Sequence, residues 1–352
     1  MVLKIFIDVS IQPERFNILF ENSIKYKKLE KYHIKIVKNY KDSDLILFLV
    51  NSQKNIINLD KEHQYIYETN IPIILLERQD TAITWVRNFE KIKNLKAIFK
   101  NRKLRKIQSN NTNKTYYGKH QFYYIHKNFK LNELKSDNAT DLGISHYSKN
   151  TKLKEINSNN LEKIMCVLWD FHSSPLCRKL SMNYFRTNPI NFNKNIDVFC
   201  VNQTKTNNFV NIPREYAKKV VNSLQNKYKI MTDNLKPNEY EKIFSNSKIA
   251  VACWGFGEWV HMDAYALYSG AILIKPDTDH VKMYPDIYRS DLVYIKCKRD
   301  YSDLKEIIID VLNNYEKYIP MIKKNRELLC SLNEENTCDL FWKKVKDIMN
   351  NN

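Results

Sequence analysis

The sequence has very little glycine: only five of its 352 residues. Three of the five, Gly255, Gly257 and Gly270, fall in the single stretch "CWGFGEWVHMDAYALYSGAILIKPD" between Cys253 and Asp277. Glycine is required where the backbone turns with positive φ or where a ligand approaches the main chain closely. The concentration of glycine therefore marks this stretch as the first place to look for a functional site.

The sequence also lacks three patterns that would identify a class of protein. Its seven cysteines are an odd number without a C-x-x-C pair, which argues against a disulfide framework and a zinc site and suits a reducing compartment. It contains no apolar run of 18 residues, the length at which a membrane-spanning helix is expected. The N-terminal run "MVLKIFIDVSI" is interrupted by Lys4 and Asp8, which is untypical of a signal peptide. We therefore expect a cytoplasmic protein without a transmembrane segment.

The sequence has fewer acidic residues than basic ones: 39 Asp and Glu against 57 Lys and Arg. The formal net charge is therefore +18. Such a charge attracts phosphate and raises nucleic-acid binding as a hypothesis. The basic residues are scattered, however, and the densest cluster, "KNRKLRK" at 100–106, has no interleaved aromatic residues on which bases stack. We interpret the cluster as a solvated basic face and expect no nucleic-acid partner.

Apolar residues make up 43% of the chain and aromatic residues 12%, which is typical of a folded globular protein. Short apolar runs, such as "LKIFIDVS", "DSDLILFLV" and "IPIILLE", alternate with segments of helix length in the first part of the sequence. This alternation predicts a parallel sheet covered on both faces. Functional residues of such sheets lie beyond the carboxyl ends of the strands. The candidates at this edge are Asp8, Ser10, Glu77, Arg78 and Asp80.

The stretch 101–160 is polar and rich in asparagine, which is typical of loops and linkers. The alternation restarts after it, with "KIMCVLWDF", "NIDVFCV", "KIAVAC" and "AILIKP" as predicted strands. At this length two domains are expected. We predict an α/β protein with two Rossmann-like domains, at 1–155 and 156–335, followed by a terminal helix at 336–352 that packs back on the first domain.

In the glycine-containing stretch, a predicted strand, a turn with Gly255 and Gly257, and a predicted helix follow one another. This order presents backbone N–H groups and the positive end of a helix dipole to an anion such as a phosphate. The alternative is a tight connection without a ligand, because G-x-G is a short motif. Gly270 has a structural interpretation, since a helix C-terminus commonly ends in a left-handed residue.

The segment "SKIAVACWGFGEWVHMDAYALYSGAILIKPDTDH" resembles the donor-binding core of GT-B glycosyltransferases. It is most similar to a bacterial and viral branch that reads approximately S-K-I, G-[WF]-G-E, R-D, E-A-L, G-A and K-P-D-x-x-H. The motif-level similarity covers about residues 240–290. The resemblance implies two Rossmann-like domains facing across a cleft, with a nucleotide-sugar donor held mainly by the second domain and a glycan or other hydroxyl acceptor.

The resemblance also implies which residues bind the donor. They are Gly255, Phe256, Gly257, Glu258, His261, Asp263, Lys275 and His280. The loop residue Lys205 is a further candidate for a phosphate contact, with a solvated lysine as the alternative.

This chain departs from the family pattern at two positions. Met262 stands where the family has Arg, and Tyr265 stands where the family has a Glu that grips the ribose hydroxyls. The departures are consistent with a changed donor, with compensation by His261 and Asp263, or with a non-catalytic relative that binds a glycan or nucleotide.

An inverting transferase needs a general base, which we expect from the first domain. Asp80 is the first candidate, with Glu77 and Asp8 behind it, and a surface carboxylate is the alternative for each. His172 of "WDFHSSP" is a further candidate for the cleft lining. The "DTD" at 277–279 resembles a metal-binding D-x-D, but an acidic turn is the simpler interpretation. GT-B enzymes generally use basic side chains and a helix end instead, so we expect neither a metal nor another cofactor.

Overall fold

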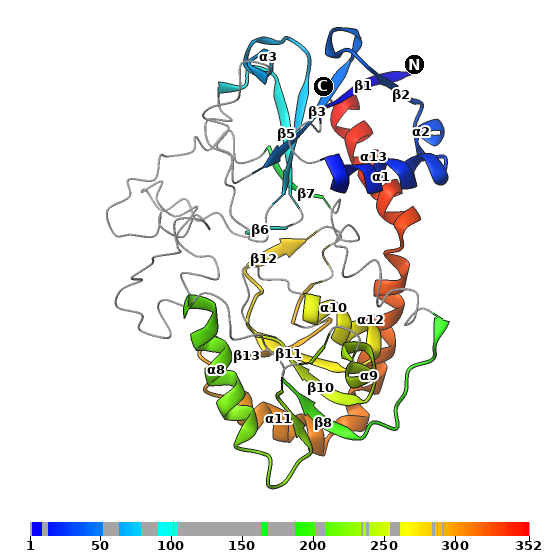
Figure 1. Cartoon of the computed structure of the whole chain (residues 1–352). Coiled ribbons are helices and arrows are strands. Elements are labelled where there is room, and N and C mark those ends of the chain that lie inside the picture. Colours follow the sequence, from blue (N-terminus) through cyan, green and yellow to red (C-terminus); the bar gives the residue numbers. More distant parts are fainter. Residues whose placement is uncertain are drawn as a thin grey trace, which may run out of the picture.

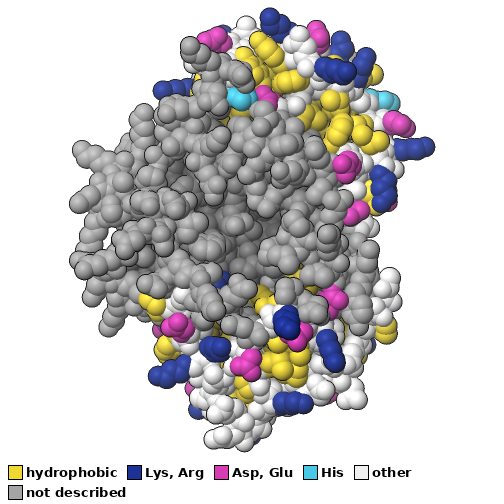
Figure 2. Space-filling view, in the orientation of Figure 1, with side chains coloured by type: hydrophobic (Ala, Val, Ile, Leu, Met, Phe, Trp, Pro, Cys, Tyr) yellow, Lys and Arg dark blue, Asp and Glu magenta, His cyan; other side chains and the backbone are white. Residues whose placement is uncertain are grey.

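A computed structural model of the chain describes residues 2–8, 13–51, 63–78, 91–100, 102–104, 163–167, 187–200, 208–233, 235–236, 239–253, 261–283, 286, 288–290 and 292–351. None of the helices in these ranges is both long and apolar enough to cross a bilayer. On the face shown in Figure 2, the described Lys and Arg side chains are scattered over both halves of the molecule and interspersed with Asp and Glu.

The first domain is built on a six-stranded parallel sheet in the order β2-β1-β3-β4-β5-β7. The strands are β1 (Leu3–Asp8), β2 (Ile34–Val37), β3 (Leu45–Asn51), β4 (Ile73–Arg78), β5 (Leu95–Lys100) and β7 (Ile164–Cys166). Between them lie α1 (Pro13–Lys25), α2 (Lys28–Lys31), η1 (Tyr40–Asp42) and α3 (Tyr65–Glu68). The central strands are almost entirely apolar because both faces of the sheet are covered, as expected for a parallel sheet.

The second domain contains a five-stranded parallel sheet in the order β13-β11-β10-β8-β9. Its strands are β8 (Ile196–Phe199), β9 (Ile230–Met231), β10 (Ser247–Val251), β11 (Ile272–Pro276) and β13 (Ile295–Cys297). Its helices are α8 (Asn208–Asn222), α9 (Tyr240–Ser245), α10 (His261–Ser269), α11 (Leu304–Asn313) and α12 (Ile319–Ser331), with η6 (Tyr315–Tyr318) before the last.

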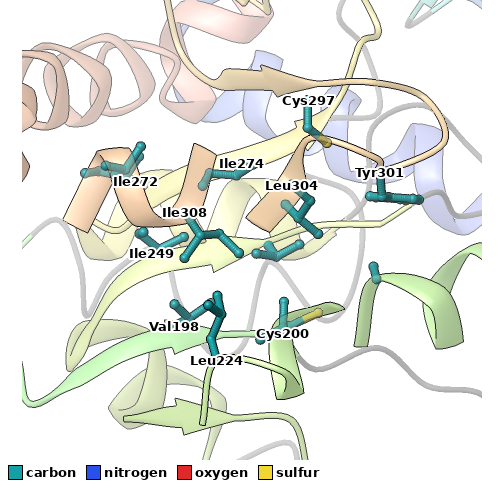
Figure 3. Packing of buried hydrophobic residues seen from close by; sticks show 14 of the residues in the cluster. Val198, Cys200, Leu224, Ile249, Ile272, Ile274, Cys297, Tyr301, Leu304 and Ile308 are labelled. Atoms are coloured by element: carbon teal, nitrogen blue, oxygen red, sulfur yellow. The ribbon is translucent and has the colours of Figure 1, made fainter. Parts of the chain in front are cut away.

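Each face of this second sheet carries its own core. On one face, Ile249 and Ile274 of the strands pack in the same cluster as Leu304 and Ile308 of α11 (Figure 3). On the other face, α9, α10 and α12 cover the sheet with aromatic and aliphatic side chains. Two parallel sheets with helices on their faces confirm the predicted α/β class with two Rossmann-like domains.

Gly270 ends α10 with φ of +74°, the left-handed conformation predicted for it. Space is also limiting here, because a Cβ on this residue would lie 2.5 Å from the Cγ2 of Ile190. Both the backbone conformation and the packing therefore require glycine.

The strand β7 differs from its predicted place. The run "KIMCVLWDF" was expected to open the second domain, but Ile164–Cys166 pairs with β5 as the edge strand of the first sheet. An apolar run of this length indicates a buried strand without indicating which sheet it joins.

The C-terminal helix α13 (Glu334–Asn350) follows the second domain in sequence but packs on the first. Phe341, Trp342 and Val345 are fully buried against the first sheet, beside Leu19 of α1. The indole Nε1 of Trp342 donates a hydrogen bond to Ser23 Oγ at 2.7 Å. In Figure 1 the helix runs from the lower domain into the upper one, so the chain crosses between the domains a second time.

A short strand pair joins the two domains. β6 (Arg102–Leu104) begins two residues after β5 ends and pairs antiparallel with β12 (Val281–Met283), which begins five residues after β11 ends. The carboxyl ends of β5 and β11 therefore lead into the same two-stranded ribbon, which lies between the two sheets in Figure 1. Because all neighbouring strands within each sheet are parallel, the two carboxyl edges face each other across this ribbon.

We predict that Trp342 is a main anchor of α13. Trp342→Ala removes a fully buried indole and the donor to Ser23, so the free energy of unfolding should fall by about 3–5 kcal/mol. Urea denaturation measures this change. The control is Lys343→Ala, which alters an exposed position on the same helix and should change stability by less than about 0.5 kcal/mol. Equal small effects of both substitutions would contradict the anchoring role.

Candidate functional site

The predicted donor-binding turn is the connection between β10 and α10. Its residues Gly255, Phe256, Gly257 and Glu258 lie outside the described residues, which end at Cys253 and resume at His261. The side chain of His261, the first residue of α10, is also outside the description. The strand that precedes these residues, β10, is the central strand of its sheet, and its carboxyl end faces the first domain.

Three other predicted residues, Lys205, Asp80 and His172, likewise lie outside the described ranges, as does Ser10. In sequence, Lys205 follows β8 and Asp80 follows β4. Their predicted roles stay predictions.

Asp263 and Lys275, both predicted donor ligands, form an ion pair with each other. Lys275 Nζ donates to Asp263 Oδ2, and both side chains are 0% exposed. The hydroxyl of Tyr288 donates to the same carboxylate oxygen at 2.8 Å, and Lys275 Nζ lies 5.3 Å from the centre of the Tyr288 ring. The pair fastens the first turn of α10 to the end of β11.

One member of this ion pair, Asp263, follows the predicted donor turn in sequence by a few residues. A buried charge costs several kcal/mol in desolvation unless its partner compensates it. The mutual pairing and the Tyr288 hydroxyl supply that compensation here. The structure therefore gives Asp263 and Lys275 a positioning task at the start of α10, and direct contact of either with a donor stays a prediction.

The "DTD" turn at 277–279 is held by protein partners. Asp277 forms an ion pair with Arg299 at 3.0 Å. Asp279 accepts hydrogen bonds from the backbone N (3.0 Å) and Oγ (2.6 Å) of Ser290 and from the hydroxyl of Tyr294 (3.0 Å). Burial alone would raise the pKa of Asp279, but these donors lower the pKa to about 2. Among the described residues, no group of three or more His, Cys, Asp or Glu side chains is placed to hold a metal ion.

His280 follows this turn and is largely buried. Burial, together with the nearby positive charge of Arg299, lowers its pKa to about 3. The imidazole is therefore neutral at pH 7. In that form His280 supplies no positive charge to a diphosphate, and its contact with a donor stays a prediction.

The two departures from the family pattern lie in an apolar core. The Tyr265 ring stacks on Phe244, with centroids 5.6 Å apart and planes 17° apart, and lies 6.3 Å from the Tyr240 ring. Met262 packs against the same cluster. Tyr265 is only 7% exposed, so the position that carries a ribose-binding Glu in the resembling family is here committed to aromatic packing.

On the facing edge of the first domain, Glu77 is also buried and paired. Its Oε1 lies 3.2 Å from Lys100 Nζ, and the two residues are neighbours in register on β4 and β5. Lys100 belongs to the basic cluster that the sequence suggested as a solvated face, yet it is 1% exposed. The sequence shows only that Glu77 and Lys100 each end an apolar run; it does not show that the two residues pair with each other.

Asp8, the last residue of β1, has two polar neighbours. The hydroxyl of Tyr65 donates to Asp8 Oδ2 at 2.6 Å, and Nε2 of His63 lies 3.8 Å from the same oxygen. Sequence analysis did not single out His63 or Tyr65, because neither belongs to a motif.

We predict that the Asp263–Lys275 pair is required as a unit. Asp263→Leu and Lys275→Met each leave one buried charge unpaired and should cost about 3–5 kcal/mol of unfolding free energy. The double variant removes both charges and should be more stable than either single variant. A double-mutant cycle by urea denaturation measures the coupling.

The control for that cycle is Lys248→Met, which breaks the partly exposed Lys248–Asp197 pair. It should cost no more than about 1 kcal/mol. Additive losses in the double variant of Asp263 and Lys275 would contradict the account.

We predict that His280 makes the fold sensitive to acid. The unfolded chain takes up a proton near the ordinary pKa of 6.5, whereas the folded chain disfavours it until about pH 3, so stability falls as the pH decreases through this window. Between pH 7 and pH 5, wild-type chain should lose up to about 2 kcal/mol more than His280→Gln. Urea denaturation at the two pH values tests this, and equal losses would contradict it. Asp279 does not interfere, because its own contribution is lost only below about pH 4.

Comparisons with known proteins give distant likenesses only. No family model and no curated protein matches the chain. Solved structures to which it is similar include an α1,3-fucosyltransferase with GDP-fucose, at 16% identity and a TM-score of 0.39, covering 92% of this chain and 82% of the other. HepE of Anabaena in complex with UDP is similar over the full length of both chains, at 10% identity and a TM-score of 0.44.

TarM is similar over 94% of this chain, at 13% identity and a TM-score of 0.41, and the chain spans 58% of the length of TarM. TM-scores below 0.5 carry no conclusion about activity. The functional argument for this chain therefore rests on its own residues.

Proposed function

We propose that this chain is a cytoplasmic glycosyltransferase that moves a sugar from a nucleotide-sugar donor to a hydroxyl group of a glycan or similar acceptor. One observation carries the proposal. The GT-B-like motif begins on β10 and continues through α10, and β10 ends at the carboxyl edge that faces the other domain across the β6–β12 ribbon. Ligands of open α/β sheets bind outside the carboxyl ends of the strands, so both domains would contribute to one site.

The chemistry of sugar transfer fits this position. As the bond from the sugar to the diphosphate breaks, negative charge grows on the leaving group, and donors already aimed at it stabilise that charge most. The N-terminal end of α10, oriented by the buried Asp263–Lys275 pair, provides a positive dipole end at this place. The backbone N–H groups of residues 255–258 would provide the hydrogen bonds.

The proposal assigns no metal to the reaction. A D-x-D metal site needs two carboxylates that converge on the ion. Asp277 and Asp279 are instead each paired with separate protein partners, Arg299 and Ser290. A helix end and backbone donors would then carry the charge of the diphosphate.

A second candidate is a non-catalytic relative that binds a nucleotide or glycan. The packing of Tyr265 and Met262 favours it, because these positions contribute neither a ribose acceptor nor a cation to a donor. Binding without turnover is the outcome that separates this candidate from the enzyme.

The test is a thermal-shift panel of UDP, GDP, CMP and their sugars in the presence of EDTA. One nucleotide diphosphate should stabilise the chain by about 2.7 kcal/mol at a hundred times its Kd, with slow hydrolysis of the corresponding sugar. Glu258→Gln should weaken this shift, whereas Glu215→Gln, at an exposed position of α8, should not.

Stabilisation without hydrolysis would support the binding relative. Hydrolysis abolished by EDTA and restored by Mn²⁺ would contradict metal independence. Salt-sensitive duplex binding with no nucleotide effect would instead support the nucleic-acid hypothesis raised by the net charge.

A further inference from the structure

Asp8, His63 and Tyr65 form a polar cluster at the carboxyl end of β1. Asp8 is the last residue of β1 and lies in direct register with Phe48 of β3, so both side chains are on the same face of the sheet. That face is otherwise apolar, with Ile46, Phe48 and Leu75 in its core. The carboxylate thus ends an apolar face at the carboxyl edge, the edge that faces the second domain.

Aromatic packing holds the cluster in one arrangement. The His63 imidazole lies edge-on to the Phe48 ring, with centroids 5.6 Å apart and planes 63° apart. Tyr65 stacks on Tyr40 with centroids 4.3 Å apart. The imidazole and the phenol therefore converge on the same oxygen of Asp8 from positions that the core fixes.

Exposure distinguishes this cluster from the other described carboxylate at the edge. The side chain of Glu77 is 0% exposed and has Lys100 as its counter-ion, so an acceptor does not reach it. The side chains of His63 and Asp8 are each 10% exposed. A general base must come within hydrogen-bond reach of the proton that it takes, which a partly exposed side chain allows.

We propose that His63 is the general base of the transfer reaction, with Asp8 and Tyr65 as positioning residues. The inference rests on the proposed glycosyltransferase function and deepens it. It replaces the carboxylate bases expected from the sequence with an imidazole whose Nε2 lies 3.8 Å from one of those carboxylates.

The step balances as a single displacement. A ring nitrogen of His63 takes the proton of the acceptor hydroxyl, and the oxygen of that hydroxyl forms a bond to the anomeric carbon. The bond from that carbon to the diphosphate breaks, and its electron pair leaves with the nucleotide. Attack opposite the leaving group inverts the anomeric configuration. Asp8 stabilises the imidazolium that forms, and the imidazolium then returns its proton to solvent.

The Tyr65 hydroxyl gives Asp8 a constant orientation. Burial and the hydrogen bond to Asp8 raise the pKa of Tyr65, so the hydroxyl stays protonated and remains a donor over the working pH range. Asp8 of β1 is the charged group that lies 3.8 Å from His63 Nε2; Tyr65 donates to that carboxylate, and Tyr40 of η1 stacks on Tyr65.

The test uses the full chain and the UDP-, GDP- or CMP-sugar that it hydrolyses, with water in place of the acceptor. His63→Gln should lower kcat by about 100-fold or more while leaving the Kd for the nucleotide diphosphate within about twofold. The acid limb of the wild-type pH–rate profile should be absent from this variant. Added imidazole should restore part of the activity of His63→Ala, which a merely structural role does not predict.

Two further variants keep the test decisive if His63 variants fold poorly. Asp8→Asn removes the counter-ion of the imidazolium and should lower kcat while leaving the Kd for the nucleotide diphosphate within about twofold. Tyr65→Phe should lower kcat several-fold with little change in KM. The matched control is His33→Asn, at an exposed histidine of the same domain, which should leave turnover and its pH profile unchanged.

The outcomes separate the two proposals. A chain that neither binds nor cleaves any nucleotide sugar overturns the glycosyltransferase proposal and this inference with it. Nucleotide binding without cleavage in wild type overturns the base and leaves donor binding standing. Wild-type turnover that His63→Gln retains within a few-fold, or a product that keeps the anomeric configuration of the donor, overturns the base alone.

Discussion

The pairing of β6 with β12 is the constraint on which the arrangement of the molecule depends. Each strand has only three residues, but each follows closely on a strand of a different sheet. Backbone hydrogen bonds between them therefore join the carboxyl edge of one Rossmann-like domain to the carboxyl edge of the other. The helix α13 connects the domains a second time, because it leaves the second domain and buries Phe341 and Trp342 in the core of the first. Two independent connections define which edges face each other.

A buried ion pair lies near the carboxyl edge of each sheet and fixes the side chains there. Asp263 with Lys275 fixes the start of α10, and Glu77 with Lys100 joins the ends of β4 and β5. Such pairs add little net stability, because the desolvation of the charges offsets their attraction. Their effect is geometric: each charge has one low-energy position, so the adjoining connections begin from fixed points. The "DTD" turn is fixed in the same manner by Arg299 and Ser290. The donor turn therefore starts and ends on rigid elements, which suits a site that must orient a flexible substrate.

Local sequence patterns predicted where strands and helices lie better than they predicted which strands pair with each other. The apolar runs of β1, β3 and β4 were evident because parallel strands buried on both faces are continuous in hydrophobicity. The conformation of Gly270 followed from its place after a helix. The sheet to which β7 belongs did not follow, since three apolar residues carry no information about a partner more than 60 residues away.

The candidate site shows the same limit. Asp263 and Lys275 were selected from the motif, but their mutual pairing depends on how α10 and β11 pack. The packing of Tyr265 on Phe244 was hidden for the same reason. His63 had no local signal at all, because its relation to Asp8 spans 55 residues and arises only when β1 and β3 lie side by side. Charged and aromatic groups whose partners are distant in sequence are thus the part that sequence analysis could not supply.

The most direct test of the account is hydrogen–deuterium exchange of the full chain with and without the nucleotide diphosphate that stabilises it. If the turn after β10 cradles the diphosphate, amide exchange should slow in residues 254–263 and in the β6–β12 ribbon, and it should be unchanged in α13. Protection confined to other segments, with 254–263 exchanging at the same rate in both states, would contradict the account.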